Sequence, residues 1–239
     1  MKRIISITLV SGAALVAFAF TVVNHRQKKL TADEVISNYV TAMGGADKLA
    51  SIKNIYMEGI INANGRKIPT RKWVVSNKCM RTETSISGIT NFTIVRRDSG
   101  WSYAPTRGRK SAEPLTANMV AASQPGLDLE GTLVNYKAKG YKVNYEGTDE
   151  IEGSEAYKLE EIINDSLVET FYFDPDSYYI MRVRLKSSMG GRVITSASDY
   201  SVYQKTADGY IFPMQIGNVR YQAIKVNSDI NEKLFKPSK

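Results

Sequence analysis

The hydrophobic pattern first predicts a short helical region that begins at residue 31. Between residues 35 and 43, apolar residues recur three or four positions apart, which is typical of one buried helix face. Thr31 and Glu34 have the spacing of a capping box, and Gly44-Gly45 is a typical helix end. We therefore expect a helix over residues 31–43, followed by a short helical turn over 46–52.

From Asn54 onward, apolar and polar residues alternate with a period of two, which indicates β-strands. The alternating segments cover residues 55–61, 71–77, 80–85, 91–96, 101–104, 141–146, 155–161, 167–174, 178–186, 194–203 and 216–227. Turn signals such as Asn64-Gly65 and Asp174-Pro175-Asp176 separate them. Roughly ten strands with few helices predict a mainly β (α+β) fold. We expect a large curved antiparallel sheet or half-barrel covered by short helices.

The alternation stops between residues 112 and 140, which predicts a helical insertion. Two short helices are expected, broken by Gln124-Pro125-Gly126. An antiparallel sheet with one face to bury needs such a cover. The apolar residues assigned to this lid are Leu115, Val120, Leu127, Leu129 and Leu133.

The N-terminus has the features of an export signal. Lys2 and Arg3 precede the uncharged run Ile4–Val23, and Ala17-Phe18-Ala19 has the small-x-small form of a cleavage site. We expect a signal peptide over residues 1–19, a short linker over 20–30 and a single domain over 31–239. The alternative is an uncleaved anchor that reaches to about residue 23. The expected location is the periplasm, or else the inner membrane through this anchor, or association with the outer membrane.

Positive charge is concentrated early in the chain. Residues 54–111 contain 11 Lys and Arg against 3 Asp and Glu, whereas residues 112–239 carry a net charge of −4. The basic patch assigned here consists of Arg66, Arg71, Arg81 and Arg96. It favours anionic partners such as phospholipid headgroups on a membrane surface, or acidic surfaces of membrane-bound transport components. A solvated outer face is the alternative, and nucleic acid is the least favoured partner because no binding module is recognisable.

Residues for common catalytic chemistry are scarce. His25, within or just beyond the leader, is the only histidine, and Cys79 is the only cysteine. The chain therefore cannot form a Ser-His-Asp or Cys-His site, and it lacks the ligands for a zinc site of His and Cys. No catalytic residue, metal or cofactor is assigned. Glu146 and Asp149 could serve a carboxylate-based glycan hydrolase, although charged turn residues are expected in that position.

Large apolar residues in the predicted strands are the positive evidence for ligand binding. A sheet that curves around itself under short helices can enclose an apolar cavity, and an ordinary filled core is the alternative. The residues assigned to the cavity are Trp73, Phe92, Trp101, Met119, Phe171 and Phe173.

Several short motifs resemble exported bacterial proteins related to the outer-membrane lipoprotein-sorting carriers. The helix that ends in Gly44-Gly45 is followed by a short Lys48-Leu49 helix and by a strand. Later come Gly153-Ser-Glu-Ala-Tyr-Lys-Leu159, Phe171-Tyr-Phe-Asp-Pro175, Gly209-Tyr-Ile-Phe-Pro213 and Asn231-Glu-Lys-Leu-Phe-Lys-Pro237. The likeness spans about residues 31–237.

The resemblance implies a half-barrel with a helical lid that shields the acyl chains of a lipid or an acylated lipoprotein in the periplasm. It also implies a basic strand residue that contacts the lid, for which the four arginines of the basic patch are the candidates. The function we expect is non-enzymatic binding in outer-membrane lipoprotein sorting. An exported interaction or regulatory module with a filled core and no lipid cargo is the alternative.

Overall fold

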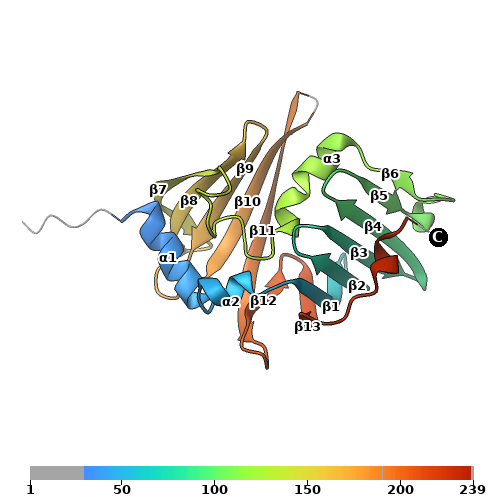
Figure 1. Ribbon diagram of the computed structural model, residues 1–239, viewed down its shortest axis with the longest axis horizontal. Helices are drawn as coiled ribbons and strands as arrows, with labels where there is room; N and C mark the ends of the chain where they lie inside the picture. Colours follow the sequence, from blue (N-terminus) through green and yellow to red (C-terminus); the bar gives the residue numbers. More distant parts are fainter. Residues whose placement is uncertain (1–29, 190, 238–239) are drawn as a thin grey trace, which may run out of the picture.

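The computed structural model describes residues 30–189 and 191–237 (Figure 1). The predicted signal peptide or anchor and nearly all of the linker lie outside the described residues. Within the described ranges, no helix is both long and apolar enough to cross a membrane.

The described strands form one antiparallel sheet of 13 strands in the order β6-β5-β4-β3-β2-β1-β13-β12-β11-β10-β9-β8-β7. The first meander consists of β1 (Asn54–Ala63), β2 (Arg66–Val75), β3 (Cys79–Ile86), β4 (Ile89–Arg96), β5 (Gly100–Tyr103) and β6 (Glu113–Pro114). The second meander consists of β7 (Lys142–Ile151), β8 (Ser154–Asn164), β9 (Leu167–Phe173), β10 (Ile180–Met189), β11 (Arg192–Lys205), β12 (Ile211–Ile216) and β13 (Val219–Val226). Pairing of β1 with β13 joins the two meanders. The predicted mainly β fold, an unclosed curved sheet with few short helices, is confirmed.

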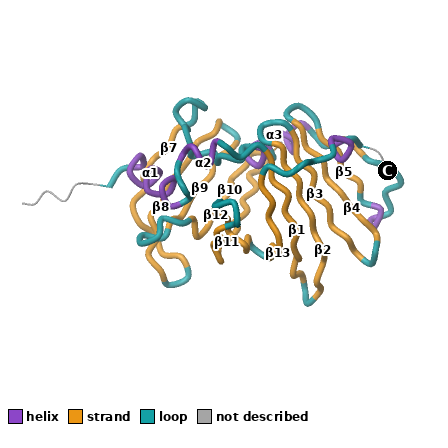
Figure 2. Tube along the Cα trace, turned by 60° about the horizontal axis from the view of Figure 1, so that its bottom comes forward, coloured by secondary structure: helices purple, strands orange, loops and turns teal. Residues whose placement is uncertain are grey.

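The helices are short, as predicted. They are α1 (Ala32–Ala42), α2 (Ala46–Ala50), α3 (Ala117–Ala122) and the 3₁₀ turns η1 (Pro105–Arg107), η2 (Gln124–Leu127) and η3 (Glu232–Phe235). The capping box of Thr31 and Glu34 is present: the Glu34 backbone N–H donates to Thr31 Oγ1 over 3.2 Å. Figure 2 shows α1, α2 and α3 on the same side of the strands.

We call the face of the sheet that α1, α3 and segment 128–140 cover the inner face, and the opposite one the outer face. In β2, Thr70, Lys72 and Val74 point to the inner face, because side chains alternate along a strand. The outer face of the first meander is covered by the C-terminal segment 228–237.

Two details of the sequence prediction were wrong. The second helix expected in the insertion, after Gln124-Pro125-Gly126, is a series of turns, because Gly131 (φ 95°) and Asn135 (φ 54°) have left-handed backbone conformations that interrupt a right-handed helix. The strand expected over residues 216–227 begins later, at Val219. Residues up to Ile216 belong to β12, and Gly217 (φ 54°) turns the chain between the two strands.

Candidate ligand-binding interior

One end of the inner face of the first meander is sealed by the insertion. Val74, Met80 and Val95 lie side by side there in β2, β3 and β4. The Leu115 side chain packs directly on Gly100. A Cβ added at residue 100 would lie 2.7 Å from the Leu115 side chain, so only glycine allows Leu115 to pack this closely. Gly126 meets the Met80 side chain in the same way, although less tightly. The lid therefore contacts the sheet along this row.

Hydrogen bonds to backbone carbonyls hold the lid in this position. The backbone N–H of Asn77 donates to the Leu127 carbonyl over 2.8 Å. The Gln124 side chain donates to the carbonyls of Arg96 and Val120, over 3.1 and 3.0 Å. On its other side, α3 faces the β8–β10 hairpins across a cavity of about 220 Å³. The α3 segment thus lies between the two meanders.

The next row of the inner face is polar and partly open. Lys72 lies in register between Met57 of β1 and Thr82 of β3. It is half-buried and has no hydrogen-bond or ion-pair partner among the described residues. Burial lowers the pKa of Lys72, and no carboxylate opposes this shift. A desolvated ammonium without a counter-charge is unusual, because its burial is normally balanced by a partner.

A cavity of about 240 Å³ begins beside this row. It is lined largely by small polar side chains of the inner face, including Thr82, Thr84, Asn91, Thr93 and Ser102. Thr82, Thr93 and Ser102 are direct neighbours across three strands, and Thr82 is also the neighbour of Lys72. The sheet therefore presents a cation followed by a row of hydroxyl groups.

Two tyrosines continue the polar interior across the centre of the sheet. Tyr221 lies in register with Gly59 on β1, and Tyr200 is on β11. Burial raises the pKa of Tyr200 to about 12, and the nearby Glu169 and Tyr221 contribute to this increase. Burial alone raises the pKa of Tyr221. Both side chains are half-buried, and neither hydroxyl has a hydrogen-bond partner among the described residues.

A pair of carboxylates lies at the far side of this interior. Glu161 of β8 and Glu169 of β9 are cross-strand neighbours, and the hydroxyl of Thr132 donates to Glu169 over 3.1 Å. Glu161 is fully buried, and both its carboxylate oxygens lack a hydrogen-bond partner. Burial raises the pKa of Glu161 to about 7; the nearby Thr132 hydroxyl opposes this increase, and the charge of Glu169 adds to it. Lys139, which forms an ion pair with Asp128, lowers the pKa of Glu161.

In the second meander, helix α1 fills the inner face. Tyr39 meets Phe173 edge to face with ring centroids 5.5 Å apart, and Phe171 stacks beside Phe173 at 6.2 Å. Tyr179 and Tyr203 stack at 4.2 Å. Such contacts belong to a well-packed core. Among the residues assigned to the cavity, Phe171 and Phe173 therefore lie in the core beneath α1.

The aromatic residues assigned from the first meander lie on the outer face. Trp73, Phe92 and Trp101 form a cluster with Ile94 and with Phe235 of the C-terminal segment. Strand alternation places them on this face. Trp73 directly follows Lys72 in β2, so the two side chains point to opposite faces of the sheet. Met119, the last of the six, is 46% exposed on α3. The structure thus places these six residues in three separate environments.

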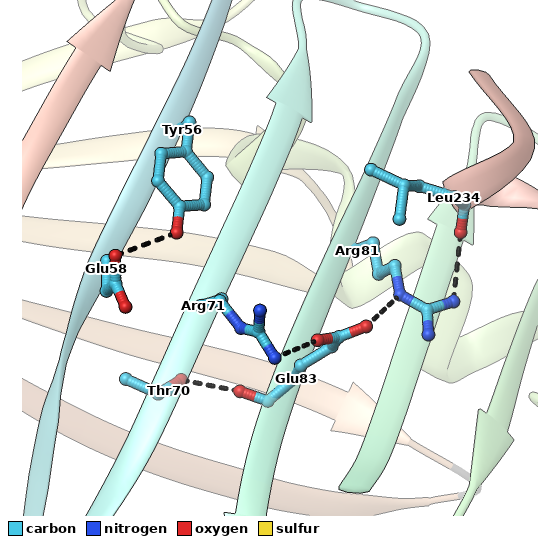
Figure 3. A network of polar contacts seen from close by, with 7 residues as sticks. All are labelled: Tyr56, Glu58, Thr70, Arg71, Arg81, Glu83 and Leu234. Atoms are coloured by element: carbon cyan, nitrogen blue, oxygen red, sulfur yellow. Dashed lines mark hydrogen bonds and ion pairs between the residues drawn. The ribbon is translucent and has the colours of Figure 1, made fainter. Parts of the chain in front are cut away.

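The arginines of the basic patch are also divided. The Glu83 carboxylate forms an ion pair with Arg71 at 3.4 Å and accepts a hydrogen bond from Arg81 over 2.8 Å. Arg81 also donates a hydrogen bond to the Leu234 carbonyl (Figure 3). Arg96 donates to the Phe235 carbonyl over 2.8 Å. Arg66 is exposed at the β1–β2 hairpin. Arg81 and Arg96 therefore hold the C-terminal segment on the outer face.

The lid residues are placed more uniformly. Val120, Leu127 and Leu133 are buried at 6%, 2% and 1% exposure, and Leu115 and Leu129 are half-buried. Leu133 and Leu129 pack in the core under α1, whereas Leu115 covers Gly100 in the first meander. The insertion therefore contacts both meanders.

Sequence reasoning did not identify the polar interior. The residues missed are Lys72, Glu161, Glu169, Tyr200 and Tyr221. The signal that was present is the alternation in β2, where Lys72 shares a face with the apolar Val74 and not with the exposed Arg71.

Comparisons with known proteins support the fold. No family model and no curated protein matches the chain. Among solved structures, a domain assigned to outer membrane lipoprotein sorting from Vibrio parahaemolyticus aligns with a TM-score of 0.52 and 13% identity, over 84% of this chain and 94% of that one. A LolA superfamily protein from Nitrosomonas europaea has the same TM-score and identity, over 87% and 98%. A DUF1329 family protein from Desulfovibrio piger also aligns at 0.52 and 13%, over 84% and 97%.

These three structures cover nearly all of the described chain and nearly all of their own length. At 13% identity, the likeness concerns the arrangement of the backbone. The chain therefore shares its fold with these three solved structures, of which one is named for outer membrane lipoprotein sorting and one for the LolA superfamily.

Proposed function

We propose that this protein binds the acyl chains of a lipid or an acylated lipoprotein in the interior of its sheet, without catalysing a reaction. We further propose that it does so in the periplasm, as part of lipoprotein sorting to the outer membrane. The observation that carries the proposal is the partly open interior of the first meander. There Lys72 is half-buried without a hydrogen-bond or ion-pair partner among the described residues, and its cross-strand neighbour Thr82 lines a cavity. In the adjoining second meander, the hydroxyls of Tyr200 and Tyr221 also lack a hydrogen-bond partner among the described residues.

The physical basis is the transfer of acyl chains out of water. Each methylene group that is kept from water is stabilised by about 0.8 kcal/mol. The cavity of about 240 Å³ is smaller than the roughly 300–1,000 Å³ of typical ligand pockets. A bound chain would therefore extend past the cavity toward Met57 and Ile224, which are partly exposed apolar neighbours on the inner face. Movement of α3 would give further space.

The first test is binding of a fluorescent fatty-acyl probe to delipidated protein. The wild-type protein is expected to bind the probe, and Thr93→Trp is expected to weaken binding at least about tenfold because the indole occupies the cavity. Thr90→Trp is the matched control, since it is the same substitution on the outer-face side of β4 and should leave binding unchanged. Equal binding by all three proteins would place the probe elsewhere, and no binding by the wild type would contradict the proposal.

Native mass spectrometry of protein purified without detergent would identify the cargo. A co-purified phospholipid, fatty acid or lipoprotein is expected. A clean ligand-free mass, together with failure to bind acyl probes, would instead favour an exported interaction module. For such a module, the exposed Val193 and Ile194 of β11 offer an apolar contact surface.

A further inference from the structure

The position of Lys72 indicates which chemical class of acyl ligand the interior accepts. Lys72 is in the middle of β2, and its neighbours Met57 and Thr82 lie in the middle of β1 and β3. The other cation at an inner-face position of β2 is Arg66, which is exposed at the hairpin end. Lys72 therefore brings a positive charge into the interior and not to its rim.

Within residues 30–189 and 191–237, no group neutralises that charge. Arg71, the next residue, points to the outer face and pairs with Glu83. For Lys72, no hydrogen bond or ion pair is formed among the described residues, and burial is the sole cause of its lowered pKa. Removing an unpaired ammonium from water is unfavourable unless an anion accompanies it. An anionic group of a bound ligand would supply the missing partner.

The surroundings of Lys72 suit an anionic headgroup attached to an apolar chain. Thr82, Thr93 and Ser102 extend from Lys72 on one side and offer hydroxyl donors to an oxyanion. Met57 and Ile224 extend from it on the other side and offer apolar contact.

We propose that Lys72 and the neighbouring hydroxyl groups bind the anionic headgroup of the ligand, so that the protein selects acidic amphiphiles over neutral ones of the same chain length. This inference rests on the proposed function and narrows it. A carboxylate from a fatty acid and a phosphate from an acidic phospholipid share the required chemistry. Charge-assisted hydrogen bonds are the source of the selectivity.

The test compares dansyl-undecanoic acid with its methyl ester, using the full mature chain. The wild-type protein should bind the acid about tenfold more tightly than the ester, as expected for a hydrogen-bonded charge. Lys72→Met should lose this preference while its affinity for the ester stays the same, and Lys72→Arg should retain it. Lys67→Met is the matched control, since Lys67 is exposed on the outer-face side of the same strand.

The outcomes separate this inference from the proposed function. If the wild type binds acid and ester equally, or if Lys72→Met keeps the preference for the acid, the headgroup site is wrong while acyl binding stands. If neither probe binds to the wild type, both proposals fail. Lys72→Gln provides a second neutral variant should Lys72→Met not fold. Competition by dodecanoate and by dodecyl phosphate then shows whether the site prefers a carboxylate or a phosphate.

Discussion

In the second meander, α1 and the aromatic side chains of β9 and β11 fill the inner face, whereas in the first meander the inner face is lined by threonines and Lys72. Phe173 is fully buried, while Thr82, at a comparable inner-face position, remains half-buried beside a cavity. The two meanders use the same alternation of side chains. They differ in what covers them, because α1 packs on one meander while α3 contacts only one end of the other.

The difference suggests a division of tasks within one sheet. The filled meander provides the stability of a packed core, because it buries both aliphatic and aromatic side chains beneath α1. The open meander has few large side chains on its inner face, so its polar groups remain available to a ligand. A ligand site placed next to a rigid packed region keeps its geometry without being filled itself.

The largest expected effect is on the filled meander. Phe173→Ala should lower the free energy of unfolding by about 3–5 kcal/mol, because it removes a buried ring that contacts Tyr39 and Phe171. Thr82→Ala in the open meander should change it by less than about 1 kcal/mol. Urea unfolding followed by circular dichroism measures both. Similar losses in the two variants would show that the meanders are equally packed, which would contradict the comparison.

A second effect is expected from the buried carboxylate at the boundary of the two regions. The folded pKa of Glu161 is about 7, against 4.5 when exposed, so the folded chain binds more protons than the unfolded chain between these values. Stability should therefore fall as pH rises through this window, by about 3 kcal/mol in total between pH 4 and pH 8. Glu169, Asp128 and Lys139 face the same group, and the charge of Glu169 acts in the same direction.

The measurement is urea unfolding at pH 4 and pH 8 for the wild type and for Glu161→Gln. The variant should lose most of this pH dependence and be more stable than the wild type at pH 8. Glu155→Gln serves as the control because Glu155 is exposed at the start of the same strand. An unchanged pH dependence in Glu161→Gln would show that Glu161 is not held protonated in the folded protein.

The strands could be predicted from the sequence because alternation is a local property. Alternation also shows which residues share a face. Trp73 and Lys72 point to different faces of β2, and Phe92 and Thr93 point to different faces of β4. It does not show which face becomes the interior. That choice depends on distant segments, since Leu115 and η2 cover one face while Phe235 covers the other. Trp73, Phe92 and Trp101 were therefore assigned to the cavity, although they lie beneath the C-terminal segment.

The polar interior could not be predicted for a related reason. A lysine in a strand is normally exposed, so Lys72 was not assigned to the interior although it shares a face of β2 with the buried Val74. Glu161 and Glu169 occupy inner-face positions of β8 and β9 next to the buried Leu159 and Phe171, and segment 128–140 folds over them, with Thr132 donating to Glu169. The turns of that segment depend on Asn135, whose left-handed backbone conformation is not specified by hydrophobic periodicity.

The smallest expected effect on stability is that of Phe92→Leu, a substitution that also distinguishes the two faces of β4 in ligand binding. The Phe92 ring packs against Tyr103 with centroids 5.3 Å apart, and the Arg81 guanidinium lies 3.9 Å from its centroid. Phe92→Leu should therefore lower the free energy of unfolding by about 1–2 kcal/mol. Its affinity for the acyl probe should equal that of the wild type, because the ring is on the outer face. Thr93→Trp, at the adjacent residue, should show the opposite result, with weak binding. If Phe92→Leu instead weakens binding as much as Thr93→Trp, the ligand site includes the outer aromatic cluster, and the inner face of the first meander is not the interior that holds the ligand.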